Sequence, residues 1–309
     1  MPTGSTSTGT LTRRRFLGRA ATLAGAGGTA ALAGCSSGEA TGTAGYTEWL
    51  AAPALFGGRR YFFEYYDVAA IRDQRGTFDP PVYEAYRAWA ADGYDHFGLP
   101  FDAIDEELLG VNRHVTTLRG EWDRAAIDER LRTAGYVQAD PHAGFDLYWH
   151  RIAELAVAVD SDRLLRARRT GRSPLGTVRL FVDVGTGEKR RYVHADTVMA
   201  ELTDRLGEAT YVYGFPHLPT EETRAERGEF QGARARGIAR TVDGSETTDR
   251  VVVTFDDESG VVRDDIVAWL ESAPFFDDAR SIETGREGRS AVVTVRRSTA
   301  ALDEISPRV

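Results

Sequence analysis

Several residue types are scarce in this chain of 309 residues, and their scarcity excludes some functions. Cys35 is the only cysteine, so an internal disulfide is excluded. Lys189 is the only lysine, and no glycine-rich phosphate loop ending in Lys-Ser or Lys-Thr occurs. The Gly-x-Ser-x-Gly nucleophile elbow is also absent; the closest stretch, Gly171-Arg172-Ser173-Pro174, lacks the second glycine. No catalytic or cofactor motif therefore identifies the folded part.

The N-terminal region has no apolar run long enough to cross a membrane. The weakly apolar run Ala20–Ala33 is rich in glycine and shorter than the roughly 20 residues that a spanning helix needs. It follows four arginines and no acidic residue, which is the pattern of an export signal. This signal resembles the twin-arginine consensus. The residues that carry this resemblance are Arg13, Arg14, Phe16 and Leu17.

A signal-peptidase box follows the apolar run. Leu32-Ala33-Gly34-Cys35 resembles the lipobox of bacterial and archaeal lipoproteins, in which the cysteine thiol receives a lipid. We expect residues 1–34 to be a removable signal and residues 35–45 to be a flexible Ser/Gly/Thr/Ala tether. A two-chain lipid on Cys35 would hold the protein stably on the extracellular face of the cell membrane. The alternative is a free thiol, or cleavage without lipidation.

The remaining chain is acidic and almost free of lysine. Removing residues 1–34 removes four arginines and no acid, which leaves 34 basic (38 − 4) and 47 acidic residues and a net charge near −13. Together with the signal, this composition indicates a halophilic archaeon, although a GC-rich genome also replaces lysine with arginine. No basic cluster occurs, which argues against nucleic acid and against electrostatic adhesion to anionic lipid.

Hydrophobic patterns predict an α+β fold with a mainly antiparallel sheet. Asp123 and Asp196 are predicted helix N-caps, and Gly135 is a predicted C-terminal glycine. The predicted helices cover 82–91, 104–109, 123–133, 196–206 and 261–272. The predicted strands cover 60–66, 111–118, 145–149, 155–159, 177–184, 211–215, 250–255, 278–283 and 290–295.

The order β-α-β-β occurs twice, which suggests an internal duplication. We expect a first unit over 46–170 and a second over 171–309, or one continuous domain over 46–309. The stretch Gly120-x-Trp122-Asp123 and the stretch from Leu131 to Val159 carry turn glycines, a cap and core aromatics. They resemble a recurring unit in uncharacterised haloarchaeal lipoproteins and in envelope proteins of the DUF3352 type. That resemblance implies the architecture and an envelope setting, and it carries no catalytic residue.

Candidate chemistry is sparse. Asp140, His142 and Asp146 could hold a divalent cation, but turn-stabilising roles explain them equally well. Asp256-Asp257-Glu258 lacks the spacing of a calcium loop, and helix capping explains it better. No metal site, cofactor or catalytic residue is therefore predicted. The tryptophans expected in the core are Trp49, Trp122, Trp149 and Trp269; any of them at the surface would favour carbohydrate binding.

The leading functional hypothesis is a non-catalytic, membrane-anchored lipoprotein that binds an envelope partner. The first alternative is a solute-binding receptor for a transporter, which a deep cleft between the two units would favour. The second is an extracellular hydrolase, which a pocket joining His142 or His194 with carboxylates would favour.

Overall fold

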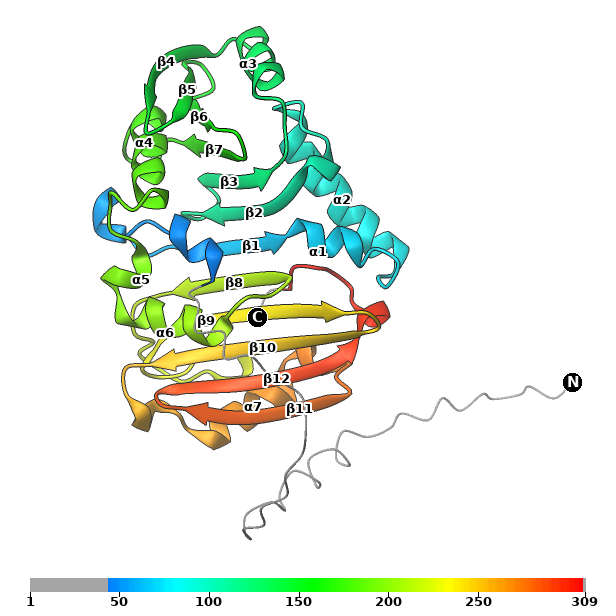
Figure 1. The fold of residues 1–309 in the computed structure, drawn as a ribbon. Coiled ribbons are helices and arrows are strands. Elements are labelled where there is room, and N and C mark those ends of the chain that lie inside the picture. Colours follow the sequence, from blue (N-terminus) through cyan, green and yellow to red (C-terminus); the bar gives the residue numbers. More distant parts are fainter. Residues whose placement is uncertain (1–43, 308–309) are drawn as a thin grey trace, which may run out of the picture. The chain divides into compact units, whose positions relative to one another are not determined.

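One antiparallel sheet of twelve strands runs through residues 44–307, the part of the chain that this computed structural model describes (Figure 1). Across the sheet the order is β11-β12-β10-β9-β8-β1-β2-β3-β7-β6-β5-β4. The fold is α+β with a mainly antiparallel sheet, as predicted. The strands are β1 (Phe63–Asp67), β2 (Ile104–Gly110), β3 (Val115–Gly120), β4 (Val137–His142), β5 (Phe145–His150), β6 (Leu155–Val159), β7 (Arg163–Arg168), β8 (Tyr211–Pro216), β9 (Ala233–Asp243), β10 (Glu246–Phe255), β11 (Ser281–Glu287) and β12 (Ser290–Ser298).

Helices cover both faces of the sheet, which separates two apolar cores. What we call the α2 face carries α1 (Val68–Asp73), α2 (Pro80–Asp95), α3 (Arg124–Thr133) and α7 (Arg263–Ser272). What we call the α6 face carries α4 (Pro174–Gly185), α5 (Tyr192–Ala195), α6 (Thr197–Leu206) and the 3-10 helices η3 (Gly45–Trp49) and η4 (Pro53–Phe56). None of the helices in residues 44–307 combines the length and apolarity that crossing a membrane requires.

Alternation along the strands assigns their side chains to the two cores. In β10, Val251 and Val253 lie in the core under the α2 face, whereas Val252 lies in the core under the α6 face. Because both faces are covered, such a strand is apolar at successive positions. This is why 250–255 is recognisable as a strand in the sequence.

Strands β1 and β8 join the N-terminal and C-terminal halves of the sheet. They pair antiparallel from Phe63 opposite Gly214 to Tyr66 opposite Tyr211 (Figure 1). After the helix, the two predicted β-α-β-β units differ: four strands, β4 to β7, follow α3, whereas two strands, β11 and β12, follow α7. Their pairing differs, since β12 lies next to β10 whereas β6 and β7 separate β5 from β3. An internal duplication therefore stays a prediction.

Two predicted elements have the wrong type. Residues 177–184, predicted as a strand, belong to helix α4, because Ser173 Oγ accepts a hydrogen bond from the Gly176 amide and Pro174 occupies the first helical turn. Residues 104–109, predicted as a short helix, form β2 between β1 and β3. Pairing on both sides of β2 overrides the helix preference of its Glu and Leu residues.

Most other elements are confirmed, with shifted ends. The Asp123 carboxylate accepts a hydrogen bond from the Ala125 amide and the Asp196 carboxylate from the Val198 amide, both at 2.9 Å, so both predicted caps are correct. Gly135 has φ of 86°, as its C-terminal role requires. Strand β3 starts four residues after the predicted Val111 because a left-handed turn precedes it. No predicted range covers helix α1 or strands β4, β7 and β9.

Candidate functional site

An open groove of about 1150 Å³ lies on the α6 face, beside α5 and α6. Its other side comes from the segment after β10 and from the turn between β11 and β12. Ala44, the first described residue, also lines the groove, so the described part of the chain begins there. Small residues such as Ala200 and Gly207 leave space between charged side chains. The groove is larger than the neighbouring pocket beside Tyr65, which has a volume of about 360 Å³.

The arginines of the groove have partners within the protein. Arg289 Nε donates to Glu201 Oε2 at 2.7 Å, and Arg205 Nη1 donates to Glu287 Oε2 at 2.8 Å. Arg190 Nε donates to the His194 carbonyl at 3.0 Å. The ion pairs neutralise Arg289 and Arg205, whereas Arg190 binds a neutral carbonyl and keeps its positive charge.

Two carboxylates of the groove are unpaired. Asp204 and Glu208 are exposed, and neither forms a hydrogen bond or ion pair with another described residue. Glu208 also lines a smaller neighbouring pocket with Asp67 and Tyr65. The groove therefore presents net negative charge to solvent.

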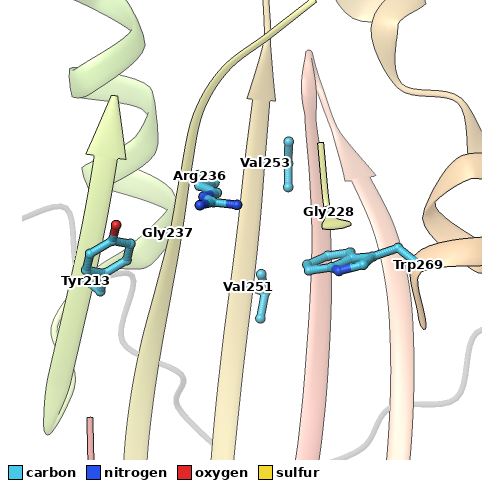
Figure 2. Close-up of a pocket in the computed structure, with 7 residues that line it drawn as sticks. All are labelled: Tyr213, Gly228, Arg236, Gly237, Val251, Val253 and Trp269. Atoms are coloured by element: carbon cyan, nitrogen blue, oxygen red, sulfur yellow. The ribbon is translucent and has the colours of Figure 1, made fainter. Parts of the chain in front are cut away.

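A second, enclosed pocket lies on the α2 face and is too small for a ligand (Figure 2). Figure 2 shows the Trp269 indole beside Val251 and Val253, with Tyr213 and Arg236 across the strands. The pocket has a volume of only about 10 Å³, the space of roughly one water molecule. A Cβ atom on Gly228 would lie 2.9 Å from Trp269 Nε1. This pocket is a packing gap.

Two buried glutamates lie under the α2 face, on neighbouring strands. Glu64 on β1 is 2% exposed and Glu107 on β2 is 5% exposed. Arg113 binds Glu64 with both arms of its guanidinium, Nε to Oε2 at 2.6 Å and Nη2 to Oε1 at 2.8 Å. A buried carboxylate normally needs such a partner to stay ionised. Glu64 has one.

Glu107 lacks a cationic partner. Its Oε2 accepts a hydrogen bond from the Tyr94 hydroxyl of α2 at 2.8 Å, and within the described residues no basic nitrogen lies within 4.0 Å of the carboxylate. Burial raises the pKa of Glu107 to about 7, although the bond from Tyr94 and the nearby Arg166 oppose the increase. This carboxyl group therefore titrates near neutral pH.

The Arg113 side chain comes from a left-handed turn between β2 and β3. Val111, Asn112 and Arg113 have φ of 49°, 55° and 65°, values that cost a residue other than glycine roughly 1–2 kcal/mol each. Asn112 Oδ1 accepts a hydrogen bond from the Phe62 amide at 3.0 Å, and the ion pair with Glu64 fixes the end of the turn. These contacts hold a backbone conformation that the residues alone do not favour.

The predicted export and lipidation residues lie outside the described residues. They are Arg13, Arg14, Phe16, Leu17, Leu32, Ala33, Gly34 and Cys35. Their roles stay predictions.

The candidate cation ligands do not converge. Asp146 forms an ion pair with Arg124 on the α2 face, whereas His142 Nε2 lies 2.5 Å from Asp183 Oδ1 of α4 on the α6 face. Asp256 binds Arg234 at 2.6 Å, and Asp257 caps η7 (Glu258–Gly260) rather than α7. No group of three or more His, Cys, Asp or Glu residues within 44–307 is placed to hold a metal ion.

The histidines are scattered over the fold. The His96 ring lies 2.6 Å from the Tyr136 hydroxyl, and the His150 ring accepts a hydrogen bond from the Ala153 amide. The His217 ring lies 2.6 Å from the Leu218 carbonyl. His194 lines the groove together with carboxylates, but its ring forms no hydrogen bond or ion pair within the described residues. It lacks the bound carboxylate that orients a catalytic imidazole.

One predicted core tryptophan is at the surface. Trp149 is 37% exposed because β4 and β5 form the end of the sheet, beyond most of α4, and Val137 opposite it is also exposed. Trp49 and Trp269 are buried, as predicted, and Trp122 is partly buried with Nε1 donating to the Asp160 carbonyl at 3.0 Å.

The sequence contained a signal for the buried glutamates. Glu64 is a charged residue inside the aromatic run from Tyr61 to Tyr66, where strand alternation directs it toward the same face as Tyr66. Glu107 carries no such signal, because the Glu and Leu residues of its segment favour a helix. The groove is not predictable from local patterns either, since it combines Ala44 with residues from 190–208, 257–258 and 288–289.

Comparisons with known proteins leave family and function open. No protein-family model matches the chain, and no curated protein matches it. Among solved structures, crystal form III of TP0453 has a TM-score of 0.49 at 9% identity, covering 81% of this chain and 95% of that chain. Crystal form I of TP0453 has a TM-score of 0.48 at 9% identity, covering 84% and 95%. These likenesses are too distant to support a statement about function.

Proposed function

We propose that this protein is a lipoprotein held on the extracellular face of the cell membrane by a lipid on Cys35, where it binds an envelope partner without catalysing a reaction. The order of signal, box and cysteine in residues 13–35 supports the anchor. The groove on the α6 face supports partner binding. It is large and open, and two unpaired carboxylates, Asp204 and Glu208, line it.

The position of the groove fits a role close to the membrane. Ala44 lines it, and nine peptide units (44 − 35 = 9) separate this residue from Cys35. A fully extended chain of that length spans at most about 30 Å. A lipid on Cys35 would therefore keep the groove near the membrane surface, within reach of membrane-bound partners.

The fold supports this proposal over a solute receptor. A receptor whose two lobes close over a solute needs a hinge between the lobes. Here β1 and β8 pair through four residues each and join the two halves in one sheet. A hydrolase gains some support from His194 and the carboxylates in one groove, but the unpaired ring of His194 weighs against it.

The test is co-purification from gently solubilised membranes at high salt, comparing charge-reversed variants. Asp204→Arg with Glu208→Arg reverses the unpaired charge in the groove. We expect this variant to lose at least 90% of a stoichiometric partner, because short-range ion pairs persist when long-range fields are screened. Asp92→Arg with Glu129→Arg, on exposed positions of α2 and α3, changes net charge equally and should keep the partner. Equal retention by both variants would remove the groove as the binding surface.

A further inference from the structure

The contact between Tyr94 and Glu107 joins helix α2 to the sheet. Tyr94 lies in the last turn of α2 and is 1% exposed, and its hydroxyl is 2.8 Å from Glu107 Oε2. Three other α2 side chains are buried under the same face: Tyr83, Tyr86 and Ala90. The Tyr94 hydroxyl is thus the polar contact in an otherwise aromatic interface, and Glu107 is the group that receives it.

The charged and titratable groups around Glu107 come from four elements. Helix α2 contributes Tyr86 and Tyr94, and β1 contributes Glu64 and Tyr66. The turn after β2 contributes Arg113, and β7 contributes Arg166. Neither arginine forms an ion pair with Glu107.

Both arginines are engaged elsewhere. Arg113 binds Glu64, and Arg166 Nη2 donates to Thr116 Oγ1 at 3.2 Å. Glu64 adds a second negative charge nearby. An ionised Glu107 would therefore be buried without a bonded cation and next to another carboxylate, an arrangement that strongly favours its protonated form.

Within residues 44–307, the surroundings of Glu107 offer neutral tyrosine hydroxyls but no free cation that would balance a new negative charge. Tyr86 and Tyr211 have buried hydroxyls that meet no hydrogen-bond partner within the described residues, and both rings contact Tyr66, at centroid distances of 5.7 and 5.0 Å. Because Tyr94 of α2 lies against the buried carboxyl group of Glu107, separation of α2 from the sheet would expose that group to water. Ionisation of Glu107 and opening of α2 are consequently linked.

We infer that Glu107 is a proton-dependent latch, which holds α2 on the sheet while it is protonated and releases α2 when its proton passes to water. Release uncovers the tyrosine-lined surface of the sheet beneath α2, formed by Tyr66 of β1 and Tyr211 of β8. This regulation concerns the opposite face of the sheet from the groove, so it does not depend on the proposed partner-binding role.

The direction of the pH effect follows from the two states. With α2 open, the pKa of Glu107 returns to its ordinary value of 4.5, whereas with α2 closed it is about 7. The equilibrium for opening should rise about tenfold per pH unit between these values and level off above pH 7, for a total of up to about 300-fold. The stabilisation is complete below pH 4.5 and is lost as pH rises to 7.

Amide hydrogen exchange of the full chain at constant high salt, from pH 5 to 9, tests the latch. Protection of residues 80–95, corrected for the intrinsic exchange rate, should fall with pH in the unmodified protein. In Glu107→Gln it should be independent of pH. Glu106→Gln, next on the same strand but partly exposed and paired with Arg119, should keep the pH dependence. Protection of α6, on the other face, reports whether a change is local.

A second variant tests the latch if Glu107→Gln folds poorly. Tyr94→Phe keeps the carboxyl group of Glu107 and removes a hydrogen bond that lowers its pKa. The pH above which the opening equilibrium levels off should therefore be higher in this variant. Protection of α2 that does not change with pH in the unmodified protein overturns the inference. The inference is also overturned if the protection of α2 depends on pH in Glu107→Gln as it does in the unmodified protein. The same holds if Tyr94→Phe does not change the pH at which the opening equilibrium levels off.

Discussion

At the scale of single residues, backbone conformation gives the clearest prediction. Ala143 and Gly144 form the two-residue turn between β4 and β5 with φ of 47° and 90°, so both are left-handed. Asn-Gly is the preferred pair in such a turn, whereas alanine is strained there. Ala143→Asn should raise the free energy of unfolding by about 1 kcal/mol, measured by denaturant titration at high salt.

A matched control separates turn geometry from a general effect of asparagine. Ala126 is exposed on α3 with ordinary helical geometry. Ala126→Asn should destabilise the protein by about 0.5 kcal/mol through lower helix propensity. If both variants lost stability, strain at Ala143 would not be the cause.

Some residue-level features were predictable from the sequence and others were not. Asp123 and Asp196 stand out because a capping side chain acts on amides two residues away. The exposure of Trp149 depends instead on where the sheet ends, which no local pattern contains. The same holds for the burial of Glu107, which requires α2 to cover β2.

At the scale of elements, the N-terminus of α6 gives a second prediction. Asp196 accepts hydrogen bonds from the amides of Val198 and Met199, at 2.9 and 3.3 Å, and so satisfies donors that the first turn leaves unpaired. Asp196→Ala should reduce the free energy of unfolding by about 1 kcal/mol and increase hydrogen exchange in the first turn of α6.

The control keeps the cap and removes the charge. Asp196→Ser retains a side-chain acceptor but loses the ion pair with Arg60, which is long at 3.6 Å. Most of the stability should return. A loss equal to that of alanine would assign the effect to the ion pair.

Element types were predicted well where local signals agreed. Helix α6 combines a cap, a glycine end and a helical apolar period, and its predicted bounds differ by one residue. The predicted types of helix α4 and strand β2 are wrong. Val-rich segments such as α4 favour strands, and segments of Glu and Leu such as β2 favour helices, but tertiary contacts override these preferences. The Ser173-Pro174 start of α4 was the available local signal.

At the scale of the whole molecule, the proposed attachment to the membrane gives the third prediction. Cys35→Ser removes the thiol that the predicted lipid needs, so the protein should move from the membrane fraction into the medium. Immunoblots of the two fractions measure this. Ser36→Ala, one residue further, should remain with the membrane. A Cys35→Ser protein that stayed in the membrane fraction would contradict the anchor.

Strand order is the part of the fold that the sequence could not supply. The pairs β1–β8 and β3–β7 join segments about 150 and 50 residues apart, and only the folded chain brings them together. Local patterns predict the class of the fold because alternation and helical periods are local. They do not specify neighbours, and so the groove went unpredicted.

The two edge strands determine what happens when copies of this protein meet. An open sheet always ends in two rows of unpaired backbone groups, which tend to pair with other copies. Here β4 contains Pro141 and a register shift between Ala139 and His142, and β11 carries Glu283, Arg286 and Glu287. Proline removes a donor, and the charges must be desolvated before another strand can pair. Copies of this protein that collide edge to edge, as the proposed lipid tether would promote, therefore do not readily grow into a shared sheet.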